Sequence, residues 1–434
     1  MNFRTAALSC TFAVIGLASP VHAQTVIDAI AKGRPVIDLR ARYETVQDAS
    51  KALDANAGTL RARLGYETGS WNGLSLQTDF DQIWAIGGAA YNSTRNGKTA
   101  YPVVADPAMT ALNRLQLTYA SDFDTKFVLG RQRLLIGNQR FVGNAGWRQH
   151  EQTYDALSAV NNSIDGLTLN YAYLYRVNRV NGPEVPVPAN TTAAATGQAS
   201  YFKSDSHVMD GVYTGVPGLR LEGYAFLLDL SSPGYAVLPA QQLATARLST
   251  ATIGGRGDYG LPLADGVAAK ISGEFAHQSE YANNPLSVSL NYWLGEGSVT
   301  WQGLTGLAGY EVLEGNGTIG FATPLATLHA FNGWADMFLV TPTNGLKDLY
   351  MKAAYTVLAD FVAAKALNLA VVWHDYRTDT RNQGIGNEWD LQAELVMDAS
   401  LSFMAKYARY EGAGTAFGGS PDKSVFWLQT AWKY

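Results

Sequence analysis

Four arginines occur close together in residues 130–149, a segment that also holds side-chain amides, glycines and two aromatic residues. The residues of interest are Arg131, Arg133, Arg140, Arg148, Phe141 and Trp147. A guanidinium binds a carboxylate through two parallel hydrogen bonds, and an aromatic ring offers a flat apolar surface for stacking. We therefore predict that this segment folds into a lumen and faces a sugar acid. An ordered external loop without a role in transport is the alternative interpretation.

A second group of arginines recurs at the polar positions of segments in which polar and apolar residues alternate: Arg40, Arg42, Arg61, Arg63, Arg114, Arg176 and Arg220. A lipid-facing arginine at mid-bilayer would cost about 2–4 kcal/mol, so these side chains must point inward if the segments cross a membrane. Some of them would pair with Glu44, Glu67, Asp79 or Glu222 and brace the wall. The excess of arginine over the whole set predicts a cationic pore lining, which favours anions.

The sequence offers no group of residues spaced for catalysis or for metal binding. His150 and Glu151 lack a second histidine four residues after the first, so they do not match the zinc-protease pattern. His277, His329 and His374 stand singly along the chain, and we assign them hydrogen-bonding or interfacial roles. We therefore predict no cofactor, no metal and no enzymatic activity.

Polar and apolar residues alternate with a period of two in many segments. In residues 58–67, one face holds Leu60, Ala62, Leu64 and Tyr66, and the other holds Arg61, Arg63, Gly65 and Glu67. The same alternation begins at Ile37, Leu74, Leu167, Leu286 and Trp389. Such segments are typical of transmembrane β-barrel strands, although each one alone would also fit a half-buried strand of a soluble sandwich.

Short and long connections alternate between these segments. The short links lie near 67–73, 120–125, 161–166, 215–218 and 262–266. The long ones run through 47–58, 85–110, 134–153, 178–205, 230–250, 278–284, 314–344, 377–387 and 412–423. Outer-membrane barrels have short periplasmic turns and long extracellular loops. Because each long loop joins two strands, the sequence predicts an all-β protein, a transmembrane antiparallel β-barrel of 18 strands with 16 as the alternative, in one domain.

The first residues predict export from the cytoplasm. Residues 1–23 combine Arg4 with an apolar run and a cleavage site at Val21-His22-Ala23, which is the pattern of a secretory signal peptide. The barrel domain would then cover residues 24–434 and would contain no cysteine, because Cys10 is the only one in the chain. The formal charge of −5 would become −6 on loss of Arg4, which argues against nucleic acid as a partner.

The last residues predict insertion into the bacterial outer membrane. One face of the terminal segment holds Phe426, Leu428, Thr430, Trp432 and Tyr434, and the other holds Trp427, Gln429, Ala431 and Lys433. The barrel-assembly machinery recognises an amphipathic last strand that ends in an aromatic residue. We expect this machinery, outer-membrane lipid and lipopolysaccharide as partners, with the apolar face directed outward.

Several motifs resemble the signature of the alginate export family of outer-membrane channels. They are Gly-Arg-Gln-Arg at 130–133, Gly-Asn-Gln-Arg-Phe-Val-Gly at 137–143 and Trp-Arg-Gln at 147–149. Further ones are Thr-Pro-Leu-Ala-Thr-Leu-His at 323–329, Phe-Asn-Gly-Trp-Ala-Asp at 331–336 and Glu-Trp-Asp-Leu at 388–391. The resemblance implies a monomeric barrel of eighteen strands with an arginine-rich, loop-gated pore for an anionic uronate polymer. It assigns pore roles to Arg131, Arg133, Arg140 and Arg148, whereas Arg40, Arg42, Arg61 and Arg63 match only in strand position.

Three functions follow as hypotheses. The first is a passive outer-membrane channel with an arginine-rich pore for an anionic saccharide, either alginate or another uronate-type polymer or oligomer. The alternative is a general or small-organic-acid porin of the same architecture, without a polymer preference. The third is an outer-membrane enzyme, which would need a serine and histidine pair at the barrel wall.

Overall fold

The structure is a computed structural model that describes residues 20–183, 200–231, 245–358, 364–414 and 420–434. In chain order the elements are α1 (Pro20–Ala31), β1 (Arg34–Asp48), β2 (Ala55–Glu67), β3 (Leu74–Ala90), β4 (Met109–Ala120), β5 (Thr125–Gln132), β6 (Thr153–Ile164), β7 (Leu167–Asn178), β8 (Tyr201–Tyr213), β9 (Leu219–Leu227), β10 (Leu230–Ser231), β11 (Thr250–Ala264), β12 (Val267–Glu280), β13 (Ser289–Trp301), β14 (Leu304–Leu313), η2 (Leu328–Ala330), β15 (Leu346–Leu358), β16 (Ala366–Arg377), β17 (Gly384–Val396), β18 (Leu401–Gly412) and β19 (Lys423–Lys433).

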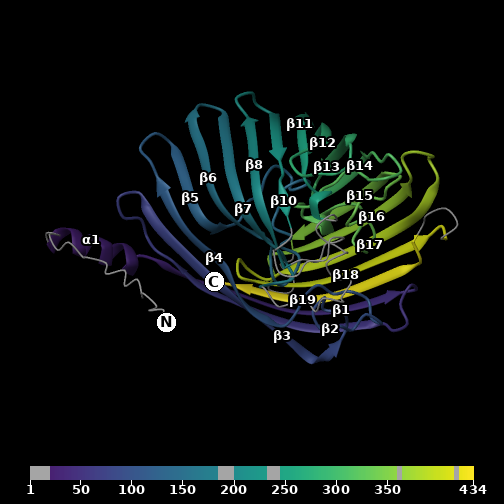
Figure 1. Ribbon diagram of the computed structural model, residues 1–434, viewed down its shortest axis with the longest axis horizontal. Helices are drawn as coiled ribbons and strands as arrows, with labels where there is room; N and C mark the ends of the chain where they lie inside the picture. The colour runs from purple at the N-terminus through teal and green to yellow at the C-terminus, as the bar shows by residue number, and fades with distance from the viewer. Residues whose placement is uncertain (1–19, 184–199, 232–244, 359–363, 415–419) are drawn as a thin grey trace, which may run out of the picture.

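The strands form one antiparallel sheet that closes on itself as a barrel (Figure 1). Strand β10 continues β9 in the same register against β8, since Leu227 lies opposite His207 and Leu230 lies opposite Ser204. The two segments therefore count as one strand, and the barrel has 18 strands. The prediction of an all-β antiparallel barrel of 18 strands is confirmed, and the alternative of 16 strands is wrong.

The barrel closes where β19 pairs with β1, which lie side by side in Figure 1 as the yellow and purple ends of the sheet. The pairing runs from Asp38 opposite Lys433 to Asp48 opposite Lys423. Leu428 is 47% exposed on the outer surface, whereas Trp427 is 1% exposed and points inward. The predicted faces of the last strand are confirmed.

Inward and outward residues alternate along each wall strand, because successive side chains of a strand point to opposite faces. On β2, Arg61 and Arg63 are 1% and 3% exposed and point into the barrel. Leu64, the next residue along the strand, is 53% exposed on the outer face. The outer surface carries many large apolar side chains, among them Phe80, Leu117, Ile253, Trp293 and Leu391. The period of two in the sequence thus predicts the two faces of the wall correctly.

Two of the long connections fold into the barrel and fill much of its lumen. We call residues 133–152, between β5 and β6, the first lumen loop, and residues 314–345, between β14 and β15, the second lumen loop. They meet through a parallel bridge between Val142 and Leu325, where the Gly143 N–H donates to the Leu325 carbonyl at 2.9 Å. The hydrophobic core, which includes Phe141 and Phe321, lies between these loops and the wall.

The N-terminal part of the described chain is the helix α1, which contacts the turn after β2 through a hydrogen bond from the Gly69 N–H to the Ala29 carbonyl at 2.8 Å. Of the predicted signal peptide, residues 1–19 lie outside the described residues, and residues 20–23 begin α1. Among the helices that the structure describes, none combines the length and the hydropathy needed to span a membrane.

Candidate functional site

The first lumen loop starts directly after β5, and this corrects the predicted loop at 130–149. Gly130, Arg131 and Gln132 belong to β5, because their ladder with β6 continues through Arg131 opposite Asp155 and Gln132 opposite Tyr154. Of the four arginines in that segment, Arg131 is therefore placed by the wall and the other three by the loop.

Arg131 and Arg133 lie at the base of the first lumen loop, and each binds one carboxylate through two hydrogen bonds. Arg131 donates to Asp155 from Nε at 2.7 Å and from Nη2 at 3.0 Å. Arg133 donates to Glu151 from Nε at 2.7 Å and from Nη2 at 2.6 Å. Their side chains remain 22% and 31% exposed.

Arg131 lies opposite Leu115, which is 46% exposed on the outside, so its side chain belongs to the outer face of the wall. Arg133 belongs to the lumen side, because its partner Glu151 also binds the inward Arg63.

Arg140 lies apart from the other predicted arginines, deep between the two lumen loops. Its Nε donates to Glu311 of β14 at 2.8 Å, and its Nη2 donates to Asn332 of the second lumen loop at 3.0 Å. The neighbouring Phe141 packs against Tyr224 and other rings of the core. Arg140 therefore joins the first lumen loop to the opposite wall, and Phe141 is a core residue.

Arg148 joins the first lumen loop to the second one and to β1. Its Nη2 donates to Asp336 at 3.0 Å, and its Nη1 lies 3.3 Å from Glu44 and 3.7 Å from Asp106. Burial lowers the pKa of Arg148, but the three carboxylates Glu44, Asp106 and Asp336 raise it above its usual value. The guanidinium is therefore charged at any pH at which the protein is folded.

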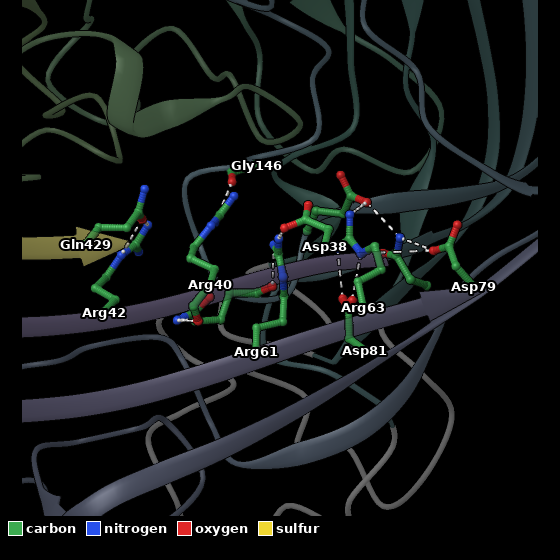
Figure 2. A network of polar contacts seen from close by, with 12 residues as sticks. Asp38, Arg40, Arg42, Arg61, Arg63, Asp79, Asp81, Gly146 and Gln429 are labelled. Carbon is green, nitrogen blue, oxygen red and sulfur yellow. Dashed lines mark hydrogen bonds and ion pairs between the residues drawn. The ribbon is translucent and has the colours of Figure 1, made fainter. Parts of the chain in front are cut away.

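The wall arginines Arg40, Arg42, Arg61 and Arg63 form one row on β1 and β2, with Arg40 directly opposite Arg61 in the ladder (Figure 2). Arg63 is at the centre of a buried network. It donates to Asp81 from Nε at 2.7 Å and from Nη2 at 2.9 Å.

Glu151 of the first lumen loop connects this network to Arg133, since it accepts from Arg63 Nη1 at 2.6 Å as well as from Arg133. Burial raises the pKa of Glu151, but the guanidinium groups of Arg63 and then Arg133 lower it to about 2. The loop therefore carries a firmly ionised carboxylate between two cations.

The other three wall arginines bind the end of the first lumen loop. Arg61 donates to the Gln149 carbonyl at 3.2 Å and pairs with Asp38 of β1 at 2.5 Å. Arg42 donates to the Trp147 carbonyl at 2.6 Å and lies 3.7 Å from Asp106. Arg40 donates from Nη1 to the carbonyls of residues 146, 147 and 148 at 3.1–3.2 Å. The wall row thus fixes the loop by its backbone as well as by its side chains.

Charge pairing dominates this side of the lumen, which we call the arginine face (the inward side of β1–β6). Of the eight predicted site arginines, only Arg40 has no carboxylate within 4.0 Å in the described part of the chain. Outside that set, Arg114 pairs with Asp79 and Arg220 pairs with Glu222. Both pairs agree with the prediction that some arginines brace the wall by pairing with Asp79 or Glu222. The net cationic field of the lining is therefore smaller than the number of arginines suggests.

The opposite wall, which we call the acidic face (the inward side of β14–β17), carries Glu311, which pairs with Arg140, and further carboxylates that bind other groups of the second lumen loop and the wall. Glu388 accepts the Ala335 N–H at 2.6 Å, and Asp390 accepts the Trp334 N–H at 3.1 Å. Asp348 accepts from His374 at 2.9 Å. Glu388 and Asp390 belong to the Glu-Trp-Asp-Leu motif at 388–391, which the sequence marks by its resemblance and by the polar phase of an alternating segment, whereas nothing in the sequence marks Asp348.

The acidic face positions the turn at 332–336 in the second lumen loop. A Cβ on Gly333 would lie 2.2 Å from the Tyr376 hydroxyl. The φ of this residue is +85°, a conformation that residues other than glycine rarely adopt. Asn332 donates to both Glu311 and Asp348. This turn is the Phe-Asn-Gly-Trp-Ala-Asp motif noted in the sequence, and it serves to anchor the loop.

A cavity of about 650 Å³ lies among the long connections, and residues of both lumen loops form part of its lining. Its lining includes the aromatic rings of Trp147, Trp334 and Trp427, and it also contains both cations and carboxylates: Arg148, Arg179, Lys423, Glu44, Asp48 and Asp336. This volume suits a small organic molecule, and its rings and cations can contact an organic anion. In the ranges that the structure covers, no group of three or more His, Cys, Asp or Glu side chains is arranged to hold a metal ion.

Comparisons with known proteins give structural matches only. No model of a known protein family matches the chain, and no curated protein matches its sequence. The barrel is similar to OccAB4 of Acinetobacter baumannii, with a TM-score of 0.68 at 13% identity over 93% of this chain and 98% of that one.

Two Pseudomonas aeruginosa structures are also similar. One is the outer membrane protein OprD, with a TM-score of 0.63 at 14% identity over 92% of this chain and 94% of that one. The other is OpdK with vanillate, with a TM-score of 0.66 at 11% identity over 93% and 99%. At these identities the matches establish a shared fold: the chain is an 18-stranded barrel resembling the OprD and Occ channels.

Proposed function

We propose that this chain is a passive channel of the bacterial outer membrane that conducts small organic acids. The observation that carries the proposal is the lumen: two loops narrow it, and the guanidinium group of Arg133 on its lining remains partly exposed. Guanidinium groups favour carboxylates, and a cavity whose lining includes Arg148 and Arg179 has the volume of a small molecule.

The location in a membrane is supported by the outer surface. A closed barrel satisfies every backbone group within the wall, and large apolar side chains such as Phe80 and Trp293 cover its outside. The proposal includes a signal peptide at residues 1–23, a barrel domain at 24–434 and assembly as a monomer. The mass of the mature protein from isolated membranes tests the cleavage before Gln24.

The choice of small acids over a polymer is supported by the structural matches. One similar barrel was solved with vanillate, which is an aromatic carboxylate of about the size that the cavity can hold. The uronate-polymer hypothesis rests on the motifs at 137–143 and 331–336, and both lumen loops would have to move to admit a chain of sugars. We keep it as the second candidate because the same arginines would bind uronates.

Reversal potentials in planar bilayers under a salt gradient test the charge preference. We expect the wild type to favour the anion, and we expect Arg133→Glu to weaken or invert this preference, whereas Arg131→Glu on the outer face should leave it unchanged. Arg381→Glu, in an exposed outer loop, is a control with the same change per residue. A cation-selective wild type would contradict the proposal.

Block of the single-channel current tests the substrate class. The comparison uses benzoate-type carboxylates, oligouronates and neutral oligosaccharides of matched size. Small acids should reduce the current at the lowest concentration. Block by oligouronates that strengthens with chain length would instead favour the polymer hypothesis.

A further inference from the structure

A lysine lies enclosed by aromatic rings where the two lumen loops meet the wall. The Lys406 ammonium on β18 is 3.7 Å from the ring centre of Trp334, 4.3 Å from that of Trp147 and 5.5 Å from that of Trp427. The residue is only 5% exposed. A desolvated ammonium over tryptophan faces is attracted by the negative face of each ring. We call these three rings the tryptophan cage.

The cage joins three parts of the chain that are far apart in sequence. Trp147 belongs to the first lumen loop, Trp334 to the second and Trp427 to β19. The Trp147 ring also stacks on His329 of the second lumen loop, with 4.4 Å between ring centres and 9° between planes. One ammonium therefore contacts both lumen loops and the wall at a single point.

The ammonium has one strong hydrogen-bond acceptor. Its nearest polar partner is His329 Nε2 at 2.8 Å, and His329 Nδ1 in turn lies 2.8 Å from Asp336, which Arg148 also binds. Burial first, and then the charge of Lys406, lower the pKa of His329 to about 3. The imidazole is therefore neutral at pH 7, with Nδ1–H donating to Asp336 and Nε2 accepting from Lys406.

This arrangement is costly unless the charge has a role. In the described part of the chain, no carboxylate lies within 4.0 Å of the Lys406 ammonium to form an ion pair. Arg42 lies over the same Trp147 ring at 4.0 Å, so two cations share one ring. The carboxylates of Asp390, Asp336 and Glu388 attract the ammonium from beyond 4.0 Å and offset part of the cost of its burial. An apolar side chain would still fill the space more cheaply than a buried ammonium without a direct ion pair.

We propose that Lys406 is a positioning residue of the channel: its ammonium, held in the tryptophan cage, keeps both lumen loops against the wall and so sets the aperture. The effect on aperture rests on the proposed channel function. The effect on the loops does not, because it concerns contacts within the chain alone. Loss of the ammonium should release the loops while the barrel stays closed.

Hydrogen exchange measured by mass spectrometry on the detergent-solubilised full chain tests this directly. In Lys406→Ala, amides of residues 133–152 and 314–345 should exchange at least about tenfold faster, with strand amides unchanged. Lys352→Ala is the matched control, because Lys352 is an inward lysine that is exposed to the lumen. Unchanged exchange in both loops of Lys406→Ala would overturn the proposal.

Chemical rescue separates the charge from simple packing. Lys406→Ala removes a propylammonium group, so millimolar n-propylammonium should slow the loop exchange again, whereas its neutral isostere n-propanol should not. Equal rescue by both compounds would show that the cage needs only to be filled, and this would overturn the role of the charge. If Lys406→Ala does not fold, Lys406→Met keeps the side-chain length, and wild-type loop exchange in that variant would overturn the proposal.

Single-channel recordings then test the aperture. Lys406→Ala should show a larger and noisier conductance than wild type, and propylammonium should reduce both. If neither protein conducts while the loops are released as expected, the channel function fails and the role of Lys406 in holding the loops stands. If conductance is normal and the loops stay protected, only the inference about Lys406 fails.

Discussion

The arginine face and the acidic face hold the same two loops by different chemistry. On the arginine face, carboxylates bind guanidinium groups, as in the network of Arg63 with Asp81 and Glu151. On the acidic face, Glu388 and Asp390 bind backbone N–H groups of the second lumen loop. Removing one member of a buried ion pair leaves an uncompensated charge, whereas a carboxylate bound to neutral donors can be replaced by an amide at lower cost.

The largest effect should come from Arg63→Met. This change leaves Asp81 and Glu151 without their shared cation in a buried site, and the free energy of unfolding should fall by about 3–5 kcal/mol. Urea titration of the refolded barrel in lipid vesicles, followed by tryptophan fluorescence, measures it. A loss below about 1 kcal/mol would mean that water already screens the network.

A pair of glutamate variants compares the two faces directly. Glu151→Gln should cost about 2–3 kcal/mol because it removes charge-assisted bonds to Arg63 and Arg133. Glu388→Gln should cost about 1 kcal/mol or less, since the amide oxygen can still accept the Ala335 N–H. The same titration gives both values, and equal losses would remove the distinction between the faces.

Acid should loosen the contact between the lumen loops before it affects the wall. The pKa of His329 in the folded protein is lowered from 6.5 to about 3. The stability that neutral His329 gives to the loop contact is therefore fully present above pH 6.5 and is lost as the pH falls toward 3. Between pH 6.5 and 5.5, the population with Trp147 detached should rise at most about tenfold. Acrylamide quenching of tryptophan emission reports this, and His329→Asn should flatten the pH dependence.

Among the wall arginines, the smallest effect should come from Arg40→Gln. Arg40 binds carbonyl oxygens rather than a carboxylate, and the shorter amide can still donate to one of them. The free energy of unfolding should therefore fall by about 1 kcal/mol. A loss as large as that of Arg63→Met would show that the wall row acts as one cooperative unit.

The wall could be predicted from the sequence because its signal is local. The alternation around Leu64 assigns the inner and outer faces, and the nine long connections fall between the strands that the structure shows. The last strand was assigned correctly for the same reason, since the phase of Leu428 against Trp427 fixes both faces.

The contacts inside the lumen could not be predicted, because they join residues that the chain separates widely. Arg140 meets Glu311 across 171 positions, and Arg148 meets Asp336 across 188. The cage around Lys406 left only a weak sign in the sequence, which is a single cation at an inward position of β18. A pore-lining role for each of the eight arginines stays a prediction that conduction measurements test.

The closure of β1 against β19 has a kinetic consequence. Arg42 and Gln429, which hydrogen-bond across that junction, are 387 positions apart, so the last pairing to form joins two of the most distant segments of the barrel. Until that pairing forms, both edges of the sheet keep unpaired N–H and C=O groups that lipid cannot satisfy. Folding should therefore be slow and limited by this final step, as expected for sheets dominated by contacts between distant residues. A half-assembled barrel would be a target for pairing with other unfinished sheets.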